Sequence, residues 1–370
     1  MTVAKGDTAQ STDYTDLVDS IVNILGNGSQ QSGYGQRVSS AENYIGIDDT
    51  NEISHIEWNS LKTDINLCYN HQSGSDGLAS DLSLGNIIGA DASGTTVTRI
   101  SGDDFSIDAP NADKGVNDWV AAVSTITSNE EVIAFGEYTV TTGRSFVNSS
   151  RTTSWGTTNP TIYSQMTVTF QGGYNTTDVN GNVVEASGAD HRRHFFNAGG
   201  EIHLTMFLSG GTEKDTDWGS MLGNAGIVKF RKNDTVCTGT GQARDGSSSL
   251  TFGGGGIQSA LGNYQLSTGY QVIFTKNGSQ AEYAENYVMI SAKRNASGDA
   301  ITFQFEFTDA DVGDQRPRDP GAGDPPGPGI DEAVLSGGGS MGCGIDLLRP
   351  TGSNVEVPEP SPSVDIELRL

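Results

Sequence analysis

Apolar residues at helical spacing are concentrated near the start of the chain. Leu17, Ile21, Ile24 and Leu25 repeat at intervals of three and four positions, which predicts one face of a short amphipathic helix. Gly26 follows directly and is a typical residue just beyond the C-terminus of a helix. The pattern therefore predicts a first helix that ends near Gly26.

A second helix is indicated by a capping pattern followed by a single apolar stripe. Ser54 and Glu57 have the spacing of a capping box. The stripe comprises Trp58, Leu61, Ile65 and Cys68. Because a short helix with one stripe is not stable alone, it is expected to pack on the first helix, on the later β-rich part or on another copy of the chain. We therefore treat the first three residues of the stripe as interface candidates and residues 1–72 as a helical docking region.

Residues 73–115 are rich in Gly, Ser, Asp and Thr and show no sustained periodicity, so they are predicted to be a linker. A third short helix is predicted after the linker, because Trp119, Val123 and Ile126 lie on one side of the segment GVNDWVAAVSTIT. This helix is assigned to the region that follows, residues 116–310.

Alternating apolar and polar residues dominate the rest of residues 116–310 and predict antiparallel strands. The predicted strands are EYTVTT, YSQMTVTF, GEIHLTMFLS, AGIVKFRK, YQVIFTK, AENYVMISAKR and DAITFQFEFTD. The pairs Asn180-Gly181 and Asn277-Gly278 favour type I′ hairpin turns. The predicted fold class is mainly β, with an antiparallel β-sandwich body, a short N-terminal helical region and a Pro/Gly-rich C-terminal arm.

The predicted C-terminal arm covers residues 311–370 and begins with a segment, QRPRDPGAGDPPGPGID, that cannot form a central strand or a helix. Its last residues, VDIELRL, alternate between apolar and polar and predict a strand. A strand at the end of such an arm can be added to the exposed sheet edge of a neighbouring subunit. The interface candidates in this strand are Ile366, Leu368 and Leu370.

Charge and composition narrow the classes of partner. The chain of 370 residues contains 21 Lys and Arg against 46 Asp and Glu, a formal net charge of −25. Such a surface repels phosphate, which argues against nucleic acids and anionic membranes as partners. No apolar run is long enough to cross a bilayer, and the first residues lack the apolar core of a secretory signal, so we expect a soluble protein made in a cytoplasm. The 49 glycines favour turns between short strands over long helices.

A cluster of basic residues and histidines is the first candidate for chemistry. His191, His194 and His203 could together hold a zinc ion, but HRRHFF leads directly into a predicted strand, where surface histidines are common. Arg192 and Arg193 could pair with acidic groups across a subunit contact or could be solvated surface charges, and we retain them as interface candidates.

Other motifs have stronger structural explanations than chemical ones. Asp309, Asp311 and Asp314 could bind a structural Ca²⁺, but a plain Asp-rich turn is the preferred interpretation. The strings G-x-G-x-x-G and G-x-S-x-G between Gly337 and Gly342 lack the surrounding elements and the downstream histidine that their chemistry requires, and are interpreted as a flexible loop. We nominate no catalytic, cofactor-binding or metal-binding residue and expect no cofactor.

Two strings resemble structural proteins of tailed phages, especially tail-associated virion proteins of contractile-tailed marine cyanophages. The first contains a helix ending in His71-Gln72-Ser73-Gly74. The second has the strand start F-N-x-G-G-E-I, followed by a short helix around Trp218. Its matching residues are Phe196, Asn197, Gly199, Gly200, Glu201 and Ile202. The resemblance covers about half of the chain and implies a place in the tail, baseplate or fibre. It transfers no active-site residues to this chain.

These observations lead to an expected function and two alternatives. We expect a non-enzymatic virion component, made in the host cytoplasm, that forms homo-oligomers and contacts other virion proteins through its N-terminal helices and C-terminal arm. One alternative is a fibre adhesin that binds a host receptor or glycan through exposed tyrosines or Trp155. The other is a polysaccharide-degrading enzyme, although the sequence marks no acid pair for that chemistry.

Overall fold

The computed structural model describes residues 11–29, 31–43, 53, 55–78, 81, 116–140, 147–152, 155, 160–209, 213–238, 257–258, 260–278, 285–310 and 340–369. The chain divides into two compact units, each assembled from separate stretches of sequence. Unit 1 comprises Met1–Thr139, Gly172–Gly199 and Pro350–Pro358, and unit 2 comprises Val140–Gln171, Gly200–Arg349 and Glu359–Leu370. This division differs from the four consecutive regions of the sequence prediction, because local composition does not show that residues 172–199 and 350–358 return to the helices.

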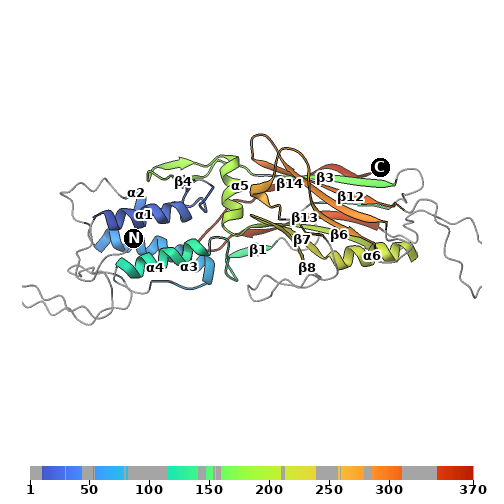
Figure 1. Cartoon of the computed structure of the whole chain (residues 1–370). Coiled ribbons are helices and arrows are strands. Elements are labelled where there is room, and N and C mark those ends of the chain that lie inside the picture. The colour runs from blue at the N-terminus through green and yellow to red at the C-terminus, as the bar shows by residue number, and fades with distance from the viewer. Residues whose placement is uncertain are drawn as a thin grey trace, which may run out of the picture. The chain divides into compact units, whose positions relative to one another are not determined.

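Unit 1 is built around three mutually packed helices, α1 (Ser11–Leu25), α3 (His55–Ser73) and α4 (Val116–Ser128), with the short α2 (Ser39–Glu42) against α3 (Figure 1). Tyr14, Trp58 and Trp119 bring one aromatic ring from each long helix into the centre. The ring centroids of Trp58 lie 5.1 Å from Tyr14 and 4.9 Å from Trp119, both edge to face. The predicted helices are therefore confirmed, but α4 belongs to unit 1 and not to the β-rich region to which the sequence assigned it.

The interface candidates of the second helix lie inside this helical core. Trp58 is 4% exposed, and Leu61 and Ile65 are fully buried. The sequence left three possible packing partners open for this helix. In the structure, α3 packs on the first helix, α1, and also on α4. These residues are thus core residues of their own chain. Ser54 of the predicted capping box lies outside the described residues.

The remaining elements of unit 1 are α5 (Gly188–Asn197) and the hairpin of β4 (Asn175–Thr177) and β5 (Val183–Glu185). The hairpin around Asn180-Gly181 is confirmed, but its turn is not of type I′. Gly181 has a φ of 79°, but the φ of Asn180 is not positive, since Gln31 is the only non-glycine with positive φ among the described residues. A type I′ turn requires positive φ at both central positions. Instead, the Asp178 carboxylate accepts the backbone N–H groups of Asn180 and Asn182.

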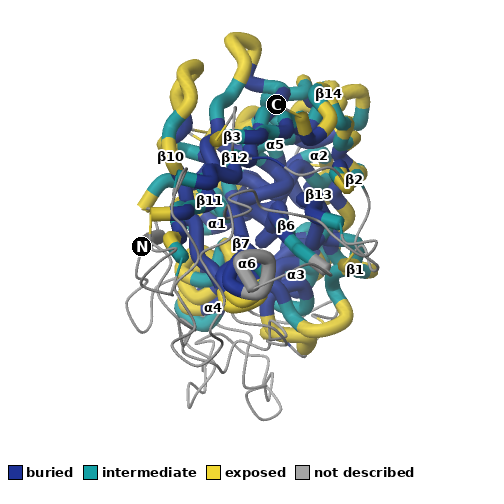
Figure 2. The backbone as a smooth tube through the Cα atoms, turned by 90° about the vertical axis from the view of Figure 1, so that its right-hand side faces the viewer, coloured by how far each residue is buried: buried dark blue, intermediate teal, exposed yellow. Residues whose placement is uncertain are grey.

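The described residues of unit 2 form two antiparallel sheets. The first sheet has the order β14 (Ser361–Arg369), β3 (Thr161–Thr169), β12 (Ala300–Thr308), β11 (Tyr287–Arg294), β10 (Gln271–Asn277) and β9 (Ile257–Gln258). Burial alternates along β3, and every second residue of β12 is completely or nearly completely buried (Figure 2). The mainly β fold class with antiparallel sheets is therefore confirmed. At Asn277-Gly278 the two strands pair as predicted, but the connection runs to Tyr287 and is longer than a two-residue turn.

In the second sheet, β13 (Ser340–Pro350), β6 (Glu201–Ser209), β7 (Ile227–Phe230) and β8 (Thr235–Thr238) are paired in that order, and β2 (Val147–Arg151) also pairs with β13. The helix expected around Trp218 is confirmed as α6 (Glu213–Ala225), which packs on β6. The short β1 (Tyr138–Val140) spans the boundary between the units, and a 3₁₀ turn, η1 (Asn263–Gln265), precedes β10.

The interpretation of the glycine-rich segment as a loop is wrong from Ser340 onwards. These residues begin β13, which pairs with β6 on one side and β2 on the other. Gly342 allows β6 to approach β13 closely, since a Cβ atom at this position would lie 2.4 Å from the Phe207 ring. Glycine frequency alone does not distinguish a loop from such a crowded strand position. Gly337 and Gly339 lie outside the described residues.

The C-terminal strand is confirmed, but its partner is β3 of the same chain. Leu368 is buried, Ile366 is half-buried, and Leu370 lies outside the described residues. The two sheets of unit 2 contact each other through aromatic rings, with the centroids of Phe230 and Phe303 5.3 Å apart. The detailed sandwich arrangement stays a prediction. The proline-rich part of the predicted arm and most of the predicted linker lie outside the described residues.

None of the described helices combines the length with the apolar character that a membrane-spanning helix requires.

Candidate functional site

The predicted cluster of basic residues and histidines lies mainly on α5. A capping box begins this helix: Ser187 Oγ accepts the N–H of Asp190, and the Ser187 N–H donates to the Asp190 carboxylate. The sequence analysis did not predict this helix, although the predicted strand follows it as β6. The surface position expected for His203 in that strand is wrong, because this side chain is buried. The capping signal S-x-x-D was present in the sequence and could have identified the helix.

The three histidines considered for zinc are not brought together as one group. His191 and His194 belong to α5 in unit 1, whereas His203 belongs to β6 in unit 2. Among the described residues, no group of three or more His, Cys, Asp or Glu side chains could hold a metal ion.

Arg193 and His194 are the centre of a buried polar network in unit 1. Arg193 donates to the backbone oxygen of Gly28 at 2.8 Å, to Asn27 Oδ1 and to the Asp190 carboxylate at 3.1 Å. The Tyr174 hydroxyl lies 2.6 Å from His194 Nδ1, and His194 Nε2 lies 3.1 Å from Asn27 Oδ1. Arg193 Nη2 also lies 3.3 Å from His194 Nε2, so the donor and acceptor roles of the two ring nitrogens depend on the tautomer.

Burial and the neighbouring Arg193 guanidinium lower the pKa of His194 to about 3. Burial raises the pKa of the Tyr174 hydroxyl, which keeps this group protonated as a donor. The network therefore holds a neutral imidazole at physiological pH, and its chemistry is that of a structural hydrogen-bond centre.

The same network fixes the loop that follows α1. Asn197 Nδ2 donates to the backbone oxygens of Gln31 and Gly33 at 2.8 and 3.0 Å. Gly35 has a φ of 77°, and a Cβ atom at this position would overlap the His194 ring. Arg193 is thus held by its own chain. Arg192, the other arginine candidate, is partly exposed on the same helix.

The two strings that carry the phage resemblance contact each other within unit 1. His71 Nε2 lies 2.9 Å from the backbone oxygen of Ala198, next to the Asn197 of the second string. Gln72 Nε2 donates to Tyr34 Oη and to the backbone oxygen of Ile126, both at 2.8 Å. Gly74 has a φ of 75° and follows the end of α3. These residues therefore connect α3, α4, α5 and the loop after α1.

The neutrality of buried His194 predicts a pH-dependent stability of unit 1. The unfolded-state pKa is near 6.5, so below this pH the unfolded chain binds a proton that the folded chain does not. This group therefore lowers the free energy of unfolding as the pH falls from about 6.5 towards 3, by up to about 1.4 kcal/mol per pH unit. In chemical denaturation between pH 7 and 5, we expect His194→Asn to be less stable at pH 7 and to show a shallower pH dependence.

Asp64 provides a control of the opposite sign. Burial raises the pKa of its carboxyl to about 6, so this group stabilises the folded state as the pH falls through 6. The Asp64→Asn variant should therefore show a steeper loss of stability on acidification than the parent chain. Equal pH slopes for the parent and the His194 variant would contradict the neutral, buried state of this ring.

A second arrangement, missed by the sequence analysis, is a buried set of ionisable residues in unit 2. Glu201 Oε2 lies 2.8 Å from His203 Nε2 and 4.0 Å from Lys229 Nζ, and all three side chains are at most 8% exposed. Asp346 of β13 is opposite His203 in the strand register. The alternation of Glu201 and His203 with Ile202 and Leu204 was the available signal. Such mutual pairing compensates part of the cost of burying each charge.

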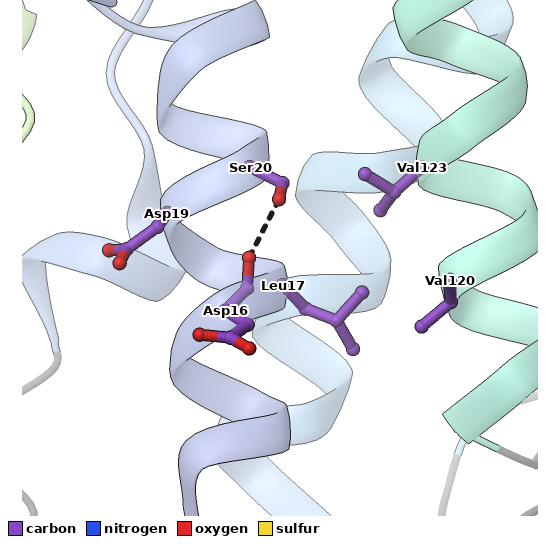
Figure 3. A pocket seen from close by; sticks show the side chains of 6 residues that line it. All are labelled: Asp16, Leu17, Asp19, Ser20, Val120 and Val123. Carbon is purple, nitrogen blue, oxygen red and sulfur yellow. Dashed lines mark hydrogen bonds between the residues drawn. The ribbon is translucent and has the colours of Figure 1, made fainter. Parts of the chain in front are cut away.

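A third feature is a pocket of about 320 Å³ between α1 and α4 in unit 1 (Figure 3). It is lined by Asp16, Leu17, Asp19, Ser20, Val120 and Val123. Figure 3 shows Leu17 directed towards the two valines, with the Asp16 carboxylate on α1 near Leu17 and the Asp19 carboxylate pointing away from α4. Burial and the nearby Asp16 carboxylate raise the pKa of Asp19. We refer to these six residues as the acidic groove.

The remaining sequence candidates are dispersed. Asp309 is buried, whereas Asp311 and Asp314 of the suggested Ca²⁺ turn lie outside the described residues. Trp155, suggested for glycan contact, is 3% exposed and packs against Trp218 with a centroid distance of 5.6 Å. An internal packing role therefore explains Trp155.

No family model, no curated protein and no solved structure matches the chain.

Proposed function

We propose that the chain is a non-enzymatic structural component of a tailed-phage virion, in the tail, baseplate or fibre. The observation that carries this proposal is the contact between the two phage-like strings, through His71 and the Ala198 backbone. Residues that maintain a catalytic site would be expected to converge on a pocket. In this chain, residues of the two strings form hydrogen bonds that join helices to loops. This arrangement is the one expected of a rigid scaffold.

The proposed route of assembly differs from the one expected from sequence. The apolar stripe of α3 is buried within its own chain, so the helical unit presents its outer faces to partners. β14 is an edge strand, and its register with β3 has two irregularities. It also contains a proline at position 362 and the exposed Asp365, Glu367 and Arg369. Bulges, proline and charges are the features that keep an edge strand from pairing with another chain. We therefore propose contacts through unit 1 in place of strand addition at β14.

Direct analysis of particles tests the proposal. The chain should be found at a constant, stoichiometric copy number in density-purified particles of the phage that encodes it, by quantitative mass spectrometry. Immunogold labelling should place it on the tail structure. A chain that is abundant in infected-cell lysate but absent from washed particles would contradict the proposal.

A further inference from the structure

We infer that the acidic groove between α1 and α4 is a docking site for a basic segment of a partner protein. The inference rests on the proposed function, because it specifies the chemistry by which unit 1 would contact another protein of the particle. The occupant is an arginine- or lysine-bearing peptide segment whose long side chain lies across the apolar floor.

The floor of the groove is apolar and suits an aliphatic stem. Leu17 and Val123 are 2% and 7% exposed at its base, and Val120 is partly exposed beside them. The volume of about 320 Å³ is at the lower end of the range of about 300–1,000 Å³ for pockets that bind small ligands. This space fits one long side chain and part of its neighbours.

The α1 side of the groove is negative. Asp16 and Asp19 are three positions apart on α1, and both are exposed. Neither α1 nor α4 contains a lysine or an arginine, and among the ion pairs of the described residues neither carboxylate takes part. An incoming guanidinium or ammonium group would relieve the repulsion between the two carboxylates.

Charge complementarity also decides between classes of occupant. A second copy of this chain carries a net charge of −25, so two copies repel each other at long range. A partner with a basic segment is attracted, and its cation and aliphatic stem match the rim and the floor together. The groove therefore favours a different, basic protein over self-association.

A binding experiment with the full chain tests this site directly. The probes are two fluorescein-labelled helical peptides of equal length, one with leucine and arginine on the same face and one with glutamate in place of each arginine. Fluorescence anisotropy should detect binding of the basic peptide and no binding of the acidic one. The Asp16→Asn/Asp19→Asn variant should bind the basic peptide at least about fivefold more weakly, as expected for the loss of two partly exposed ion pairs.

Two further variants make the result specific. Glu185→Gln/Glu367→Gln removes the same number of exposed carboxylates elsewhere and should leave the affinity within about twofold, as for charges that make no contact with the peptide. Val120→Lys places a cation from the chain itself in the groove and should reduce binding as much as the aspartate changes. Equal binding by the parent chain and the Asp16/Asp19 variant, or equal binding of both peptides, would overturn the inference.

A peptide array separates this inference from the proposed function. Overlapping peptides from all proteins of the purified particle, and from this chain, are probed with the parent chain and with the Asp16/Asp19 variant. If the variant selectively loses binding to a basic peptide from another particle protein, the docking site is supported. If it loses binding only to peptides from this chain itself, the partner assignment is overturned. A chain present in particles but with no groove-dependent binding leaves the proposed function intact and refutes the docking site.

Discussion

Replacement of Trp58 by alanine is expected to destabilise unit 1 by about 3–5 kcal/mol, the usual cost of removing a large aromatic side chain from a core. Trp58 is almost completely buried and makes edge-to-face contacts with Tyr14 and Trp119. The change removes the side chain that joins all three long helices, so a cavity remains at their centre. Hydrogen exchange of peptides from α1, α3 and α4 in the isolated chain should show the loss of protection.

Ile56 is the matched control, because it lies two positions away on the same helix and is 65% exposed. Ile56→Ala should change the free energy of unfolding by no more than about 0.5 kcal/mol. The pair distinguishes a core residue from an interface residue. If Trp58→Ala left the isolated chain as stable as Ile56→Ala but prevented association with a partner, the interface role expected from sequence would be correct.

The helices and strands were predictable because their signals are local. Apolar residues at helical spacing mark α1 and α3, and alternation marks β3, β12 and β14. Each pattern specifies one buried face, whatever covers that face. The covering element is a non-local property, which is why the stripe of α3 and the strand at residues 364–368 were equally compatible with contacts inside the chain and between chains.

Two misinterpretations came from taking composition as conformation. The glycines before Cys343 suggested a loop, but Gly342 lies in a strand where the Phe207 ring leaves no room for a side chain. The basic run at residues 192–193 suggested a surface or an interface, but Arg193 is drawn inward by Gly28 and Asn27. In both cases the deciding groups lie more than a hundred positions away in sequence, so no local pattern could have revealed them.

The acidic groove was beyond sequence analysis for a related reason. Asp16 and Asp19 appeared only as the polar side of a short helix, and Val120 as part of a separate one. The packing of α1 against α4 turns these ordinary positions into a pocket with an apolar floor and a negative rim. The buried pair of Glu201 and His203 likewise depends on the strand register that places Lys229 beside them.

Removal of residues 340–370 is expected to prevent unit 2 from folding, whereas removal of residues 361–370 alone should leave a folded but self-associating chain. The longer truncation deletes β13, which lies between β6 and β2. The buried apolar residues of β13 are Met341, Cys343, Ile345, Leu347 and Leu348. At about 1.5–3 kcal/mol for a large side chain, their combined loss is comparable with the whole net stability of a domain, about 5–15 kcal/mol.

The shorter truncation has a different physical consequence, because β14 is an edge strand that covers β3. Its removal exposes the unpaired backbone groups of β3 without the bulges and charges that protect β14, and such edges pair with other chains. Hydrogen exchange should show protected β6, β7 and β12 amides in the chain lacking residues 361–370 and no such protection in the chain lacking residues 340–370. Light scattering of the soluble material should show oligomers only for the chain lacking residues 361–370. Protected β6 and β7 amides in the chain lacking residues 340–370 would show that β13 is dispensable, and the C-terminal segment would then act as the external arm that its composition suggested.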